Sequence, residues 1–287
     1  MTVGGGTVRY LPEAAEMPSR NGGGEDTVRE AHTLKDRPWR LLLARAGVAV
    51  ACLVVWQGAS GTLIDPFWLS RPTEIAAKLA EWVASGYLFR HLGITLQETF
   101  AGFLLGAGAG ILFGFLMGRL VTLALILEPF VLAIYSLPRL ALAPLFILWF
   151  GIGLQMKVIL AAVIVFFMVF WNTYAGVKEV DTDLLDVVRI MGGTGRQMLL
   201  KVILPSALTW IFLGLKVSVP YALIGAVVGE IVASNRGLGY VIQFSAGQFD
   251  TAGIFAALVV LMIVSVSLNE LLNRGESYFL RWKRVSR

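Results

Sequence analysis

Lys216 and Glu230 are the charged residues of this sequence that bear most directly on chemistry, because both lie in one long apolar segment. A charge at the centre of a membrane-spanning helix costs about 2.5–3.5 kcal/mol on insertion scales and usually has a function. Lys216 can line a polar path for a solute or pair with an acid such as Glu128 or Glu230. It can also extend its ammonium group to the membrane surface. An ion pair or this extension is favoured over contact with a substrate. Glu230 is the second path candidate, and lesser candidates are Glu98, Gln155 and Asn172.

Motifs for catalysis are missing from the sequence. It contains no Gly-Lys dipeptide and hence no phosphate-binding Walker A loop, and it has no GxSxG, HExxH or cysteine pair. His32 and His91 do not form a convincing catalytic dyad. We therefore expect a protein that is not an enzyme and that binds no metal and no cofactor of its own. Active transport by such a chain would need an ion gradient or a separate ATPase.

The composition indicates an all-α integral membrane protein. Hydrophobic residues make up 57% of the 287 residues and charged residues only 15%. A helix needs about 20 apolar residues to cross about 30 Å of hydrocarbon, and six segments qualify. They lie at about residues 41–60, 95–117, 122–138, 157–175, 207–229 and 253–273.

Two of these segments carry patterns of their own. The third is interrupted by Pro138 and Pro144, so it is expected to be broken or re-entrant. The second has a glycine at every fourth position, which predicts a smooth face against which another helix packs closely. These helix-packing residues are Gly102, Gly106, Gly110, Gly114 and Gly118.

The polar stretch between the fourth and fifth segments, about residues 176–206, predicts two short helices joined by a glycine elbow. Acidic residues precede an amphipathic run that contains Asp186, Val187 and Val188, and Gly192 can end that helix by adopting a positive φ. Thr194 and Gln197 have capping-box spacing, so a second helix is expected to begin there and to run through Val202 until Leu204 and Pro205.

The apolar face of these two helices must be covered by something. It can lie on the membrane surface, as many interfacial helices do, or it can dock a partner protein. The spacing by itself leaves both readings open.

Basic residues are distributed unevenly about the six segments. Sixteen of the 24 lysines and arginines fall on the side that contains both termini and the stretch around Gly192, and five fall on the other side. The positive-inside rule therefore predicts that both termini and this stretch are cytoplasmic. Since topology accounts for the basic excess, no nucleic-acid partner is expected. Residues 1–38 are polar and glycine-rich, which predicts a flexible cytoplasmic tail ahead of a permease domain at residues 39–287.

Over about residues 64–282 the sequence resembles the permease subunits of ATP-binding-cassette (ABC) importers for nitrate, sulfonate, taurine and related small compounds. In that family the cytoplasmic signature is Glu-Ala-Ala, three residues, Gly, nine residues, Ile, any residue, Leu-Pro. Here Asp186, Val187 and Val188 replace Glu-Ala-Ala and Val202 replaces the isoleucine. Gly192, Leu204 and Pro205 match it. Further matches are Ser70–Glu74, Thr95–Gly118, Leu142–Gly153, Gly229–Glu230 and Arg236–Gly239.

The resemblance implies a type I importer fold in a bacterial cytoplasmic (inner) membrane, surrounded by membrane lipid. It also implies a permease homodimer, a cytoplasmic ABC ATPase that binds the ATP, and an external (periplasmic) substrate-binding protein. The stretch around Gly192 would then be the coupling loop that transmits the ATPase motion. The alternative from the residues is a gradient-driven secondary transporter or a channel, although no inverted repeat and no chain of buried acids is evident.

Overall fold

The computed structural model describes residues 38–279, and every regular element within this range is a helix. The chain forms two compact units, residues 1–58 and 59–287. The described part of the first unit, residues 38–58, consists of α2 (Pro38–Ala59) without its last residue, and this helix is long and apolar enough to cross a membrane. The predicted tail at residues 1–38 lies outside the described residues, except for Pro38.

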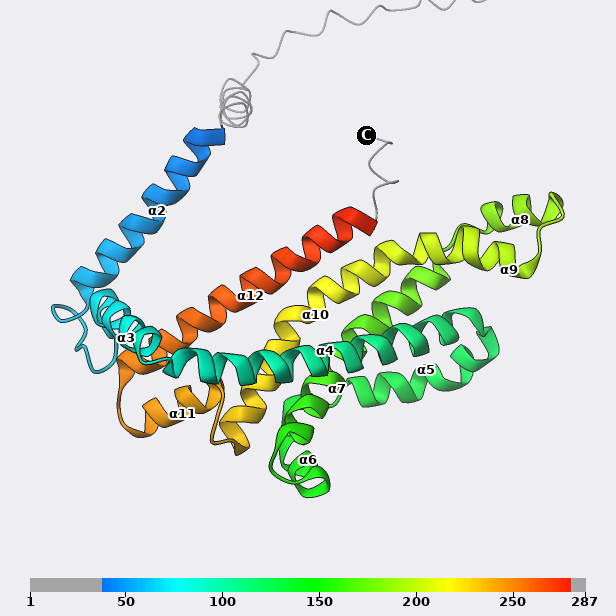
Figure 1. Cartoon of the computed structure of the whole chain (residues 1–287). Helices are drawn as coiled ribbons and strands as arrows, with labels where there is room; N and C mark the ends of the chain where they lie inside the picture. Colours follow the sequence, from blue (N-terminus) through cyan, green and yellow to red (C-terminus); the bar gives the residue numbers. More distant parts are fainter. Residues whose placement is uncertain (1–37, 280–287) are drawn as a thin grey trace, which may run out of the picture. The chain divides into compact units, whose positions relative to one another are not determined.

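The second unit is an all-helical bundle (Figure 1). Its elements in chain order are α3 (Pro72–Ala84), α4 (Tyr87–Arg119), α5 (Val121–Tyr135), the short 3-10 helix η1 (Arg139–Leu142), α6 (Ala143–Phe150), α7 (Leu154–Lys178), α8 (Thr182–Ile190), α9 (Gly195–Met198), the π-helical turn η2 (Leu199–Ile203), α10 (Leu204–Ala233), α11 (Leu238–Gly247) and α12 (Thr251–Phe279).

Helix α7 forms the centre of this unit and packs against both α4 and α10, which also contact each other. More than half of its most apolar stretch, 56%, is buried. The regularly spaced glycines of α4 face it. A Cβ atom added to Gly110 would lie 2.8 Å from the Phe166 carbonyl oxygen, and one added to Gly114 would lie 2.6 Å from that of Phe170. The neighbour of the glycine face is therefore a helix of the same chain.

Helix α10 approaches α7 in the same manner. A Cβ atom on Gly225 would lie 2.7 Å from the Cα atom of Ala161, and one on Gly229 would lie 2.8 Å from Cγ of Lys157. Lipid offers no hydrophobic drive for helix association, so close backbone contact and dispersion hold these helices together. Because glycine lacks a Cβ atom, α4, α7 and α10 lie near enough to share polar contacts at one end of the bundle.

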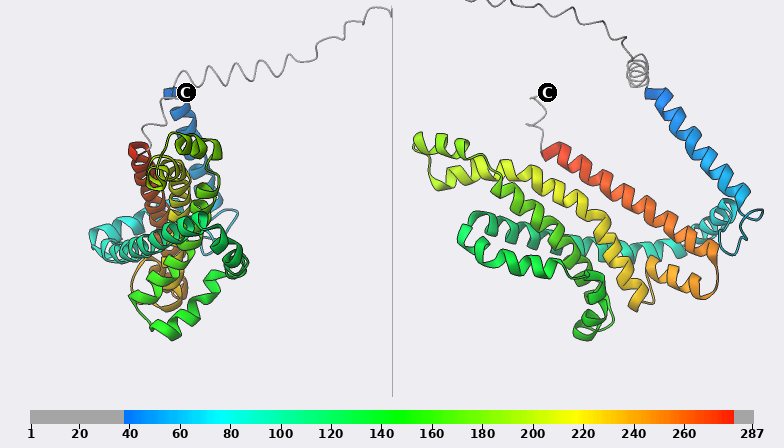
Figure 2. Two further views of the ribbon diagram at one scale, coloured as in Figure 1. Left: turned by 90° about the vertical axis from the view of Figure 1, so that its right-hand side faces the viewer. Right: turned by 180° about the vertical axis from the view of Figure 1, so that it is seen from behind.

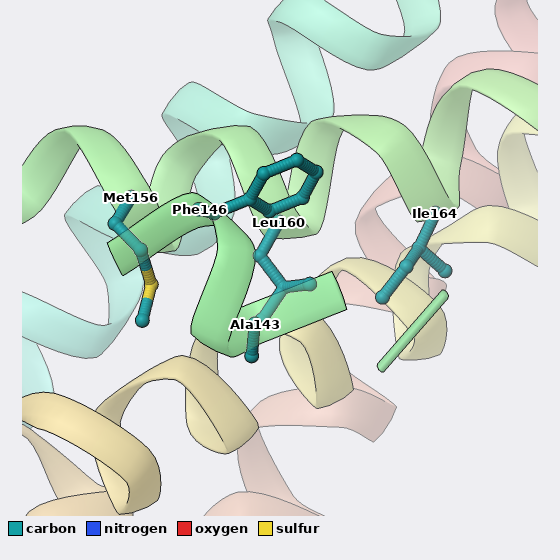
Figure 3. Close-up of a cluster of buried hydrophobic side chains, with 5 residues drawn as sticks. All are labelled: Ala143, Phe146, Met156, Leu160 and Ile164. Atoms are coloured by element: carbon teal, nitrogen blue, oxygen red, sulfur yellow. The ribbon is translucent and has the colours of Figure 1, made fainter. Parts of the chain in front are cut away.

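The third predicted span is broken. Helix α5 and the segment Arg139–Phe150 are bent by 80° relative to each other, and α5 with 15 residues covers only about 22 Å. After the bend, α6 packs on the beginning of α7 through Ala143 and Phe146 (Figure 3). The break occurs at Pro138, since proline has no N–H to continue the helix and restricts the residue before it.

The predicted spans are otherwise confirmed: the described residues 38–279 contain five helices long and apolar enough to cross a membrane, or six if the bent pair forms one span. Their ends differ by several residues from the expectation. The largest extension is in the fifth segment, where Gly195–Ala233 is one continuous helical stretch.

We expect the change Gly114→Ala to destabilise the protein by about 1–3 kcal/mol, because the new methyl group would meet backbone atoms of α7 that have no room to move. Gly108→Ala on the same helix is the matched control. A Cβ atom there meets nothing within 4 Å, so its helix propensity should make this change neutral or stabilising by up to about 1 kcal/mol. Thermal unfolding in detergent measures both. Equal midpoints for the two variants would contradict the close-packing account.

Candidate functional site

The stretch between α7 and α10 folds as two helices joined by a glycine elbow, as predicted. Asp181 caps α8, since its side chain accepts a hydrogen bond from the Asp183 N–H at 2.9 Å. Gly192 has a φ of +76°, which L-amino acids with a side chain rarely adopt. Thr194 and Gln197 form the expected capping box at the start of α9. Figures 1 and 2 show this pair at the opposite end of the bundle from α11.

The expectation that the second helix ends at Pro205 is wrong. The chain passes from α9 through the π-helical turn η2 into α10 without a break. In this turn the Leu204 N–H bonds to the carbonyl of Leu199, five residues earlier. The wider turn ends just before Pro205, which falls in the first turn of α10, where its missing N–H costs little.

The α8–α9 pair has two apolar faces. The inner face anchors the pair to the bundle, where Leu185 of α8 and Leu199 and Val202 of the following turn η2 pack on a buried cluster that includes Val180 and Ile203. The outer face is uncovered, and its side chains are at least half exposed. They are Leu184 (50%), Val187 (53%), Ile190 (86%) and Met191 (81%).

The three signature residues of α8 therefore point in different directions. Val187 belongs to the outer face, whereas Val188 packs against Gly193. Asp186 forms an ion pair with Arg189 on the exposed surface.

Lys216 forms an ion pair with Glu276 of α12, with Nζ and Oε2 2.5 Å apart. This acid is neither Glu128 nor Glu230, which were the partners considered from the sequence. Both side chains are slightly more than one quarter exposed. The pair joins α10 to the second half of α12, and a role of Lys216 in the solute path stays a prediction.

A buried group of charged residues occupies the other end of the bundle, where α4, α7 and α10 meet. Glu98 of α4 is 1% exposed and forms an ion pair with Lys157 of α7, which is 5% exposed. The second carboxylate oxygen of Glu98, Oε2, has no hydrogen-bond partner. Glu230 of α10 is also 1% exposed. Charges at this depth are tolerated only where they are paired and hydrogen-bonded.

Glu230 holds the segment that follows α10. Its Oε1 accepts a hydrogen bond from the Thr95 hydroxyl at 2.7 Å, and its Oε2 accepts one from the Gly239 N–H at 2.6 Å. Thr95 in turn accepts from the Leu238 N–H at 2.8 Å. Glu230 thus binds backbone groups at the start of α11, and its role in the solute path stays a prediction.

Two further contacts fix the connection between α10 and α11. Lys157 donates to the Ser234 hydroxyl at 3.1 Å, and that hydroxyl donates to the Arg236 carbonyl at 2.7 Å. The Gly237 N–H bonds to Nδ1 of His91 at 3.1 Å. The connection is therefore attached to both α4 and α7.

Glu98 and Glu230 are candidates from the sequence, but no pattern in it places them together. Lys157, Thr95 and His91 are not among the candidates for this site. An available signal was that Glu98 and Lys157 are ionisable residues within separate apolar segments.

Another matched motif, Ser70–Glu74, stabilises the beginning of a helix. Glu74 receives hydrogen bonds from Ser70 Oγ at 2.9 Å and from the Arg71 N–H at 3.3 Å at the start of α3. Within residues 38–279 no group of three or more His, Cys, Asp or Glu residues is arranged to hold a metal ion.

The chain is similar to a known protein family and to several transport permeases. Residues 106–279 match the family model described as binding-protein-dependent transport system inner membrane component. The chain is 34% identical to a protein of Bacillus subtilis (strain 168) named as an aliphatic sulfonates transport permease, SsuC, covering 94% of this chain and 96% of that protein. It is 35% identical to the riboflavin transport system permease protein RibX of Chloroflexus aurantiacus, covering 80% and 87%.

A third relative is the taurine transport system permease protein TauC of Escherichia coli (strain K12), at 32% identity over 80% of this chain and 88% of that protein. Among solved structures, an amino acid ABC transporter aligns with a TM-score of 0.54 and 21% identity, covering 71% of this chain and 97% of the other. The MetNI methionine ABC transporter aligns with a TM-score of 0.51 and 24% identity, covering 68% and 92%. Both of these transporter structures have the same fold as this chain.

Proposed function

This chain belongs to the family of binding-protein-dependent transport system inner membrane components and is a permease subunit of an ABC importer, and from that premise we propose that its α8–α9 pair couples it to a separate ATPase. In this proposal the ATPase binds and hydrolyses ATP in the cytoplasm. Its motion is transmitted through Asp186–Pro205 to α7 and α10, which directly flank the pair. The chain itself supplies the path for the solute.

The uncovered outer face of α8–α9 carries this proposal. Four large apolar side chains, at positions 184, 187, 190 and 191, stand at least half exposed on α8 and its C-terminal cap, while Leu185 on the other face of α8 packs on the bundle. A rigid, apolar surface of this kind fits a groove in a folded partner. The inner-face anchor gives a mechanical route, because a push on α8 reaches Ile203 and the first turn of α10 through packed side chains.

The proposed solute is a small sulfonate-, nitrate- or taurine-like compound, or a related one, delivered by an external binding protein. Support comes from the names of SsuC and TauC. RibX is named for riboflavin at similar identity, so the proposal extends to related compounds.

We further propose that two copies of the chain form the membrane part of the importer, with both termini in the cytoplasm of a bacterial cell. The support for this orientation is the excess of basic residues on the side of Arg189, Arg196 and Lys201. The basic residues are explained by topology and by contact with membrane lipid, so no nucleic-acid partner is proposed.

Purification of the tagged chain from its native membrane in mild detergent, with mass spectrometry of the associated proteins, tests the proposal. A stoichiometric ABC ATPase is the expected companion. A folded chain that is reproducibly recovered alone would favour a channel or a gradient-driven carrier instead.

A negative charge on the outer face of α8 should weaken this association. We expect Ile190→Glu to reduce the co-purified ATPase by more than about tenfold, because burying an unpaired carboxylate at an interface costs several kcal/mol. Thr182→Glu is the matched control, since it adds the same charge in the first turn of α8, where the helix dipole favours it. Unchanged ATPase recovery with Ile190→Glu would indicate that this face lies on the membrane instead.

A further inference from the structure

A cavity of about 660 Å³ lies at the end of the bundle opposite α8–α9, between the beginning of α4 and the α10–α11 connection. Its volume falls within the range of small-molecule sites in proteins, about 300–1,000 Å³. Arg90 and His91 of α4 line one side of it. Arg236 of the connection and Tyr240 and Phe244 of α11 line the other.

Arg90 and Arg236 bring two positive charges to this cavity without an acidic partner. Both are exposed, and neither forms an ion pair with any residue in the described range 38–279. The adjacent cavity, which shares Tyr87, Arg90 and Phe244 with this one, provides a contrast. There Lys78 is neutralised by Asp250 at 3.2 Å and by Glu81 at 3.8 Å. The larger cavity therefore retains a net positive charge that an anion can satisfy.

Aromatic rings form a continuous row along the same cavity. The centroids of Tyr87 and His91 are 4.4 Å apart, and His91 stacks on Tyr240 at 5.8 Å with an angle of 12° between the rings. Tyr240 continues to Phe244 at 5.8 Å. Flat, apolar groups bind well on such a surface, while guanidinium groups at its edge select for an acidic substituent.

The wall that carries Arg236 is held in place by hydrogen bonds to side chains of α4 and α7 and of Ser234, the residue after α10. Its carbonyl accepts a hydrogen bond from Ser234, which is itself bonded to Lys157, and the next residue, Gly237, is bonded to His91. The polar group of Glu98, Lys157 and Glu230 thus fixes the cavity shape before any ligand arrives. Such preorganisation reduces the entropic cost of binding.

We propose that this cavity is a binding site for an organic anion, whose acidic group is held by Arg90 and Arg236 and whose apolar body lies on the rings of Tyr87, His91 and Tyr240. A soluble sulfonate or carboxylate and the headgroup of an anionic phospholipid share this chemistry. The inference goes beyond the proposed function, in which a binding protein selects the solute. It concerns binding by the permease itself and requires neither ATP nor a partner.

Calorimetry on the full-length chain in phosphatidylcholine nanodiscs tests the site, with naphthalene-1-sulfonate as the probe. We expect saturable binding that is at least about tenfold weaker in the double variant Arg90→Gln/Arg236→Gln. The neutral naphthalene-1-sulfonamide should bind at least about tenfold more weakly to the unchanged protein. Lys78→Gln is the control for general surface charge and should alter the affinity by less than about twofold.

A second arm distinguishes the two sources of the anion. The same proteins are placed in nanodiscs that contain phosphatidylglycerol, and native mass spectrometry records the retained lipid. Sulfonate binding that phosphatidylglycerol does not weaken identifies a site for soluble anions. A lipid headgroup site is identified if phosphatidylglycerol competes with the sulfonate and if the unchanged protein retains this lipid while the double variant does not.

Three results would overturn the proposal. The first is that neither naphthalene-1-sulfonate nor phosphatidylglycerol binds. The others are equal affinity in the unchanged protein and the double variant, or a loss of affinity in Lys78→Gln as large as that in the double variant. If the double variant aggregates, Arg236→Gln alone provides the comparison, because its side chain is exposed on the connection. A negative result leaves the coupling proposal untouched, since ATPase association is measured separately.

Discussion

Replacing Gly192 by valine is expected to abolish solute uptake while the chain still inserts into the membrane. Gly192 has a φ of +76°, and a Cβ atom built there would meet nothing within 4 Å. The effect would therefore come from the backbone. A β-branched residue resists positive φ, at a cost of about 1–3 kcal/mol. The elbow would relax by changing the angle between α8 and α9, so the outer face would no longer fit the ATPase while the spans remained intact.

Gly192→Asn separates this explanation from a simple loss of flexibility. Asparagine adopts the left-handed conformation more readily than other residues with a side chain, so this variant should retain most of its uptake. Uptake by cells or by proteoliposomes containing the full importer is compared with the amount of chain in the membrane fraction. Normal uptake by the valine variant would count against a coupling role for the elbow.

Removing the positive charge of Lys157 is expected to cause the largest loss of stability, about 3–5 kcal/mol, because it leaves Glu98 as a buried charge without a partner. Lys157→Met is the suitable change. Methionine keeps the Cβ and Cγ atoms that pack over Gly229, replaces Cδ by sulfur and lacks the ammonium group. Unfolding in detergent by heat or denaturant gives the size of the effect.

The double variant Lys157→Met/Glu98→Gln is the control for this second prediction. It removes both charges, so most of the lost stability should return. In the unchanged protein Glu230 is bonded to Thr95 and Gly239, and neither variant alters these residues. A double variant as unstable as the single one, or a single variant as stable as the unchanged protein, would contradict the account of Glu98 and Lys157 as a buried pair.

Features set by local sequence were predicted well. The capping box of Thr194 and Gln197, the Asp181 cap and the elbow at Gly192 depend on residues within a few positions of one another. Pro205 is an exception, because proline usually ends a helix and the sequence therefore predicts an end there. The preceding π turn, in which the Leu204 N–H bonds to the carbonyl five residues earlier, allows the helix to continue.

Features set by distant residues could not be predicted. The partner of Lys216 is Glu276, 60 positions away and outside all six predicted spans. Likewise, Glu98, Lys157 and Glu230 come from three helices, and no periodicity within one segment shows that their ends coincide. The cavity between Arg90 and Arg236 depends on the same convergence.

The amino-acid sequence by itself determined the membrane location, the approximate spans, the glycine face of α4 and the helix–elbow–helix stretch, since each follows from composition, periodicity or short-range hydrogen bonding. Only the tertiary structure decided which helix covers that glycine face, which acids meet which bases, and which face of α8 is left open. These outcomes depend on how α4, α7 and α10 pack against one another, and packing joins residues whose separation along the chain carries no information about their distance in space.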